Sequence, residues 1–205
     1  MHAASALLGL LLLGTSAIPA VAQVRSLDWG VQGSLGFPTG DLKDTAGSGL
    51  CPGIGAHVDF NLSPDQTIRA RLDGLFFRSA RKDSAGSSGG NPWVRTLETK
   101  AQGWALGAEY LTRPFQKEPR LRLGVGLNLV KWSLDTTSNL TMTAGTNTGT
   151  VVAGSTPTWT KVGVSALATY QLSPRLSAEV RILSSSYGWE GERVQVGQLG
   201  LAWTF

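Results

Sequence analysis

The chain has 205 residues, a formal net charge of +4 and a single cysteine, Cys51. Its Lys and Arg residues are spread along the chain, which argues against a nucleic-acid-binding surface. One cysteine excludes an intrachain disulfide and a metal site built from several thiolates.

The first 22 residues predict a secretory signal peptide. An apolar core from Ala6 to Leu13 is followed by small residues at positions 20–22, and we expect cleavage after Ala22. This core is well short of the ~20 apolar residues that a membrane-spanning helix needs, which disfavours a membrane anchor. We therefore divide the chain into a signal peptide, residues 1–22, and one domain, residues 23–205.

From Leu27 onwards, apolar and polar residues alternate with the period of two that is typical of β-strands. In segment 27–37, for example, Leu27 and Trp29 alternate with Asp28 and Gly30. The segments are roughly ten residues long, the length with which a tilted strand crosses a bilayer. The other seven are 53–62, 67–77, 103–111, 121–132, 162–172, 176–184 and 196–205.

The connections between these predicted strands alternate between short and long. Short turns follow the second, fourth and sixth strands, at 63–66, 112–120 and 173–175. Long loops rich in Gly, Ser and Thr follow the first, third and fifth strands, at 38–52, 80–96 and 134–158. We expect these loops to be structureless, which is unusual inside a compact soluble domain. Long loops on one rim and short turns on the other are typical of outer-membrane barrels.

The polar face of the predicted strands combines many glycines with charges of both signs. An eight-stranded barrel has interior room only for its own side chains, so this face fits a narrow lumen. A soluble lipocalin-like barrel would instead turn its apolar face inward around a ligand. Because an unpaired buried charge is costly, we expect a charge network across the lumen, either a structural plug or a gate in which arginines exchange carboxylate partners. Its predicted members are Asp59, Arg69, Arg71, Asp73, Glu109, Arg122, Glu179 and Arg181.

Two patterns involve aromatic residues of the apolar face. In the last segment, Gln198 and Gly200 lie on the polar face, whereas Trp203 and Phe205 lie on the apolar face. This pattern resembles the C-terminal insertion signal of bacterial outer-membrane proteins, which implies recognition by the barrel-assembly machinery. Near the predicted short-turn rim, aromatic side chains would form an interfacial girdle. The predicted girdle consists of Trp29, Phe60, Tyr110, Tyr170 and Phe205.

Through these features, residues 24–205 resemble the small outer-membrane barrels of the OmpA/OmpX/OmpW-like group. The resemblance implies an all-β fold, an eight-stranded antiparallel up-and-down transmembrane β-barrel. It also implies a monomer surrounded by outer-membrane lipid in a Gram-negative envelope. We expect a non-enzymatic protein with a structural role, a porin-like narrow passage for small solutes, or a surface ligand bound through loops 38–52, 80–96 and 134–158. Four tryptophans near these loops would anchor the membrane interface or bind a partner: Trp93, Trp132, Trp159 and Trp189.

Two other functions are weighed against this one. A lipid-modifying barrel enzyme would need a catalytic site near the outer rim, and His57 is the only histidine after the signal peptide. His57 is predicted to point inward beside Asp59 and has no evident serine partner, so we expect no catalytic residues, no metal and no cofactor. An exported lipocalin-like carrier is the third possibility, which extraction without detergent would reveal.

Overall fold

The computed structural model describes residues 24–46, 49–144, 147–187 and 192–205. The predicted signal peptide, residues 1–22, and Trp189 lie outside the described residues. The described part of the chain forms ten strands and one short helix. In chain order they are β1 (Ser26–Gly40), α2 (Asp41–Ala46), β2 (Cys51–Ser63), β3 (Gln66–Phe76), β4 (Ala80–Ser88), β5 (Asn91–Thr112), β6 (Leu121–Ala144), β7 (Asn147–Ser155), β8 (Thr158–Gln171), β9 (Leu176–Tyr187) and β10 (Glu192–Thr204).

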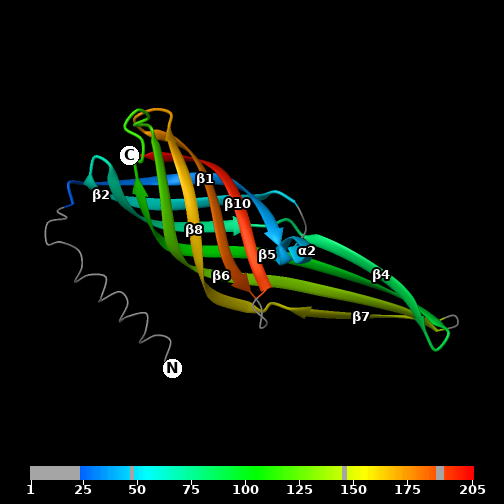
Figure 1. Cartoon of the computed structure of the whole chain (residues 1–205). Helices are drawn as coiled ribbons and strands as arrows, with labels where there is room; N and C mark the ends of the chain where they lie inside the picture. Colours follow the sequence, from blue (N-terminus) through cyan, green and yellow to red (C-terminus); the bar gives the residue numbers. More distant parts are fainter. Residues whose placement is uncertain (1–23, 47–48, 145–146, 188–191) are drawn as a thin grey trace, which may run out of the picture.

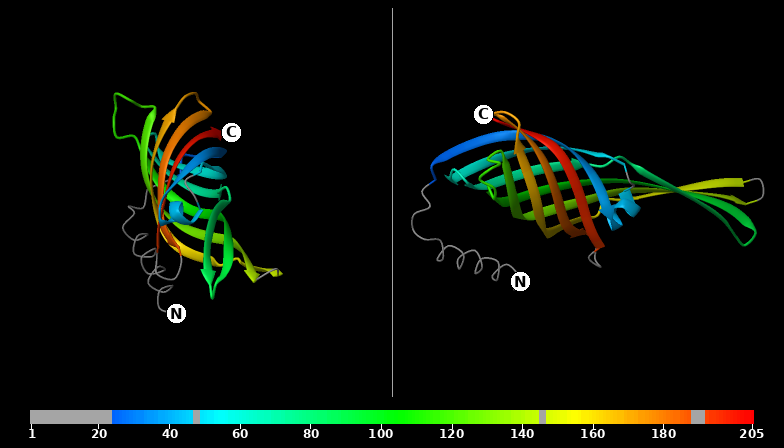
Figure 2. Two further views of the ribbon diagram at one scale, coloured as in Figure 1. Left: turned by 90° about the vertical axis from the view of Figure 1, so that its right-hand side faces the viewer. Right: turned by 45° about the horizontal axis from the view of Figure 1, so that its top comes forward.

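Eight of these strands close into a ring (Figures 1 and 2). The order around the ring is β1, β2, β3, β5, β6, β8, β9 and β10, and every neighbouring pair is antiparallel. The ring closes between β1 and β10, whose pairing runs from Gly30 opposite Thr204 to Gly40 opposite Val194. The predicted eight-stranded, antiparallel, up-and-down barrel is therefore confirmed.

The two rims of the barrel differ. The connections β2–β3, β5–β6 and β8–β9 lie at one rim, together with the start of β1 and the end of β10, and we call it the short-turn rim. At the opposite rim, α2 follows β1 and packs against β1, β5 and β10. Strands β5 and β6, with 22 and 24 residues, continue past this rim, far beyond the ~9–11 residues that cross a bilayer.

The prediction that residues 80–96 and 134–158 form structureless loops is wrong. Strand β4 pairs with the first half of β5, and β7 pairs with the second half of β6, so the two hairpins form a four-stranded sheet outside the ring, which we call the extension (Figure 2). The β4–β5 turn is made by Gly89 and Gly90, both with positive φ, a backbone that suits tight hairpins. The repeated Thr and Val residues of β6 and β7 favour strand over loop. Segment 38–52 is only partly loop, because β1 and α2 occupy its first half.

The two faces of the ring strands have opposite chemistry. Apolar side chains on the outside are largely exposed, as for Val125 and Leu127, each 64% exposed. Charged side chains point inward and are buried, as for Arg181, which is 1% exposed. This is the arrangement of a transmembrane barrel and the reverse of a lipocalin-like carrier. Among the described residues, no helix has the length and apolar content needed to cross a membrane.

Candidate functional site

The barrel lumen is filled in two layers. Along β3, the inward side chains that follow Thr67 run from the short-turn rim as Arg69, Arg71, Asp73 and then Leu75. The first three belong to a charge layer at mid-height, and Leu75 belongs to an apolar layer closer to α2. The charge layer comprises Asp59, Arg69, Arg71, Asp73, Glu109, Glu179 and Arg181, all buried.

Glu179, from β9, links the two arginines of β3 across the lumen. Arg69 donates two hydrogen bonds to Asp59, from Nε to Oδ1 at 2.7 Å and from Nη2 to Oδ2 at 2.9 Å. Its Nη1 also contacts Glu179. Arg71 donates from Nη1 to Glu179 Oε2 at 2.8 Å and from Nε to Asp73 Oδ2 at 2.7 Å. Both carboxylate oxygens of Glu179 are thus engaged by arginines.

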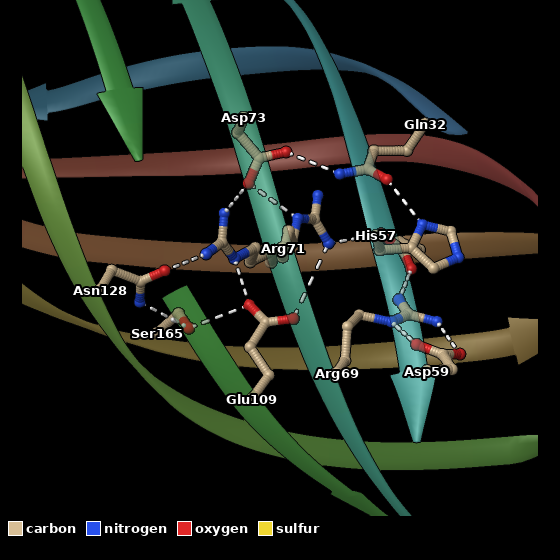
Figure 3. A network of polar contacts seen from close by, with 11 residues as sticks. Gln32, His57, Asp59, Arg69, Arg71, Asp73, Glu109, Asn128 and Ser165 are labelled. Atoms are coloured by element: carbon tan, nitrogen blue, oxygen red, sulfur yellow. Dashed lines mark hydrogen bonds and ion pairs between the residues drawn. The ribbon is translucent and has the colours of Figure 1, made fainter. Parts of the chain in front are cut away.

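Arg181 ties the remaining carboxylates together. Its Nη1 donates to Asp73 Oδ2 at 2.8 Å, and its Nε lies 2.9 Å from Glu109 Oε1. Its Nη2 donates to Asn128 Oδ1 at 2.7 Å. Ser165 donates to Glu109 Oε1 at 3.1 Å and accepts from Asn128 Nδ2 at 3.1 Å, which closes a ring of polar contacts (Figure 3). Charge-assisted bonds of this kind are roughly twice as strong as neutral ones.

His57 belongs to the same network rather than to a catalytic arrangement. Gln32 donates from Nε2 to Asp73 Oδ1 at 2.9 Å, and its Oε1 lies 2.7 Å from His57 Nδ1, which therefore carries the proton. His57 is buried inside the lumen, away from the lipid-facing surface. Within the described parts of the chain, no serine hydroxyl is hydrogen-bonded to His57.

The structure brings together seven of the eight predicted network residues and separates Arg122. Arg122 lies one level nearer the short-turn rim, where its Nη1 donates to Thr67 Oγ1 at 3.3 Å. No carboxylate in the described residues lies within 4.0 Å of its guanidinium. Gln32, Asn128 and Ser165 were not predicted as members of the network. Their places on the polar face of the alternating pattern would have indicated that they point into the lumen.

The apolar layer was not predicted, because the alternating pattern indicates a polar inward face throughout. Its largest member is Trp132, 1% exposed and 6.1 Å from Phe77 between ring centroids. Trp132, which was expected to anchor the membrane interface or bind a partner, instead lies on β6 with its side chain buried inside the lumen. The available signal was a run of apolar residues on both phases of a strand, as in Leu75-Phe76-Phe77. Members of the layer include Leu42, Cys51, Leu75, Phe77, Val130, Trp132, Leu134, Leu183, Val194 and Val196.

Helix α2 covers this layer at the rim opposite the short-turn rim. Because β5 and β6 continue past it, we call it the extended rim. Leu42 of α2 is buried among the apolar side chains, and Asp41 Oδ2 accepts the Arg193 backbone N–H at 2.9 Å. Trp159 packs against the same layer from β8, whereas Trp93 lies in the extension. Together, the charge layer and the apolar layer fill the lumen from its middle to the extended rim.

Members of the predicted girdle lie on the outside of the barrel. Trp29 and Phe205 stack with centroids 4.2 Å apart, and the Phe205 N–H donates to the Trp29 carbonyl at 2.9 Å. Tyr110 and Tyr170 are exposed on the outer surface, and Phe60 is half-buried.

The residues of the predicted insertion signal lie on β10 or, for Phe205, directly after it. Trp203 is exposed outside, whereas Gln198 is buried in the lumen. Gly200 lies opposite Ser34 of β1, and Phe205 follows the strand directly.

The described residues hold no cluster of three or more His, Cys, Asp or Glu side chains suited to a metal ion. In the charge layer, three arginines face four carboxylates at hydrogen-bonding distance, so their charges are largely compensated within the protein. This chemistry suits cross-bracing of strands on opposite sides of the lumen.

The architecture is shared with solved outer-membrane proteins. Ail, the attachment invasion locus protein of Yersinia pestis, solved in complex with the heparin analogue sucrose octasulfate, is 9% identical; the match covers 87% of this chain and 97% of Ail, with a TM-score of 0.53. A major outer membrane protein from Thermus thermophilus is 16% identical over 88% of this chain and 100% of that chain, with a TM-score of 0.50. No protein-family model and no curated protein sequence matches this chain. The chain therefore has the fold of the small bacterial outer-membrane β-barrels.

Proposed function

We propose that this protein is a monomeric, non-enzymatic barrel of the bacterial outer membrane that is closed to solutes and displays the extension on the cell surface. The observation that carries the proposal is the double closure of the lumen by the charge layer and the apolar layer. Opening a path would require separating buried ion pairs such as Arg181–Glu109, which costs several kcal/mol per uncompensated charge. A closed lumen favours the structural and surface-interaction role over a narrow passage.

The extension supports the surface part of this role. Strands β4 to β7 form one sheet that continues the barrel wall beyond the level of α2 (Figure 1). The β6–β7 hairpin exposes the large apolar side chains Val151 and Val152, and the β4–β5 hairpin exposes Val94. The partner-binding role expected of loops 80–96 and 134–158 is therefore proposed for paired strands.

The end of β10 supports assembly in the outer membrane. Trp203 and Phe205 lie on the lipid-facing side, and Gln198 faces the lumen. We expect Phe205→Ala to lower the amount of heat-modifiable, assembled protein in the outer membrane relative to Phe115→Ala, a change in an exposed phenylalanine of the short-turn rim. Equal yields of the two variants would count against the insertion signal.

Site-directed labelling tests the orientation in intact cells. Cys51 is buried, so the wild-type protein supplies an unlabelled background for a membrane-impermeant maleimide. Ser87→Cys, in the extension, should react in intact cells. Lys117→Cys, in the exposed β5–β6 turn, should react only after the outer membrane has been permeabilised. Labelling of Lys117→Cys but not Ser87→Cys in intact cells would contradict the proposed display of the extension.

A further inference from the structure

The lumen is open at the short-turn rim, where a polar vestibule of 180 Å³ extends inward to the charge layer. Asp59 and Arg69 form its inner end, and Arg122 lies on its wall. Arg120 and Arg175, at the ends of two short turns, line its mouth. The rest of its lining is mostly polar and includes Thr169, Gln171, Ser177 and Thr204, with Pro174 and Leu176 as its apolar members.

The three outer arginines of the vestibule are not matched by acids. Among the described residues, none of Arg120, Arg122 and Arg175 has a carboxylate within 4.0 Å. Arg122 has the greatest need of a further hydrogen-bond acceptor, because it is partly buried and its guanidinium has a single hydrogen bond, to Thr67. A guanidinium carries five N–H donors, so most of its donor capacity is available toward the vestibule.

The two aspartates that line the vestibule have other partners. Both carboxylate oxygens of Asp59 accept hydrogen bonds from Arg69. Asp28 accepts from Asn61 Nδ2 at 2.6 Å. The lining holds four arginines, Arg69, Arg120, Arg122 and Arg175, against these two aspartates, so the vestibule carries an excess of positive charge.

We propose that the vestibule binds a phosphate-bearing anion. Arg122 is its main contact, and Arg120 and Arg175 add positive charge at the entrance. Arginine is suited to this ligand because its planar fork binds phosphate oxygens in pairs. The vestibule is smaller than the ~300–1,000 Å³ of typical drug-sized sites, which matches a phosphate or a phosphate monoester. The phosphate comes either from a free solute or from the headgroup of an anionic phospholipid at the adjacent membrane surface.

Calorimetric titration of the folded protein in a maltoside detergent, which contains no phosphate, tests this site. Inorganic phosphate and glycerol 3-phosphate serve as the free probes, and retention of phosphatidylglycerol in native mass spectra reports headgroup binding. We expect Arg122→Gln to weaken binding of the probe that binds by about tenfold or more, since a charge-assisted contact is lost. Arg81→Gln, on the exposed surface of β4, is the matched control and should change affinity by less than about twofold.

The outcomes separate the two sources of phosphate. Binding of the free probes without retention of phosphatidylglycerol assigns the site to a solute, and retention of the lipid alone assigns it to a headgroup. Absence of both, or an equal loss in Arg122→Gln and Arg81→Gln, overturns the proposal. If Arg122→Gln does not fold, as judged by heat-modifiable migration on gels, Arg175→Gln at the exposed rim replaces it, and unchanged binding by that variant overturns the proposal.

Discussion

The charge layer and the apolar layer fill neighbouring levels of one lumen with opposite chemistry. In the charge layer, each ionic side chain depends on named partners, as Arg181 does on Asp73, Glu109 and Asn128. In the apolar layer, Trp132 and its neighbours are held by packing, which has no directional requirement. The charge layer therefore sets which strands face each other across the lumen, whereas the apolar layer excludes water beneath α2.

The largest effect is expected from removing one cation of the charge layer. Arg181→Met leaves Asp73 and Glu109 buried with fewer partners, and we expect the free energy of unfolding to fall by about 3–5 kcal/mol. Denaturant unfolding in lipid vesicles, followed by tryptophan fluorescence, measures the change. Arg81→Met, at the exposed surface of the extension, should stay within about 0.5 kcal/mol of wild type. A loss below about 1 kcal/mol for Arg181→Met would show that the buried ion pairs are weak.

A somewhat smaller loss is expected in the apolar layer. Trp132→Ala leaves a cavity beside Phe77, and we expect it to cost about 3 kcal/mol in the same assay. Trp132→Phe keeps most of the apolar volume and should cost about 1 kcal/mol. If the two variants were equally stable, packing would not be what holds this layer.

Coupling between residues distinguishes the layers further. In a double-mutant cycle of Arg181→Met and Glu109→Gln, we expect a coupling free energy of about 1–3 kcal/mol, since each side chain compensates the other. The cycle of Arg181→Met with Phe205→Ala, outside the barrel, should be additive to about 0.5 kcal/mol. Additivity in the first cycle would contradict the view of the charge layer as one connected network.

The smallest effect is expected from trimming the extension. Ser138 and Ala153 are paired between β6 and β7, so residues between them can be replaced by a two-residue Asn-Gly turn. The described residues of this segment, 139–144 and 147–152, belong to the extension outside the ring, and we expect the free energy of unfolding to change by less than about 0.5 kcal/mol. A loss of several kcal/mol would mean that the extension supports the barrel rather than being supported by it.

The alternation of residues was sufficient to predict the ring and most of the charge layer. A period of two decides which side chains share a face, so Arg69, Arg71 and Asp73 were placed together correctly on β3. The level of a residue in the lumen also depends on strand register and tilt, which the local pattern does not contain. For that reason Arg122 was grouped with a layer that it does not reach.

The extension and the apolar layer were missed for different reasons. Residues 80–96 and 134–158 are rich in Gly, Ser and Thr, a composition that indicates loops unless a distant partner strand is known. That partner is supplied by pairing such as Trp93 opposite Met142. The apolar layer was hidden because inward Val130 directly follows outward Leu129, and one strand was assigned only one apolar face.

Conductance of the purified protein in planar lipid bilayers tests the central claim, a lumen closed by both layers. The account predicts no discrete conductance steps for the wild-type protein in concentrated KCl. It also predicts none for Glu109→Gln, because the apolar layer would still exclude water and ions. Steady conductance steps in the wild type that change in Glu109→Gln would contradict the account, and would show that the charge layer is a gate in a continuous path.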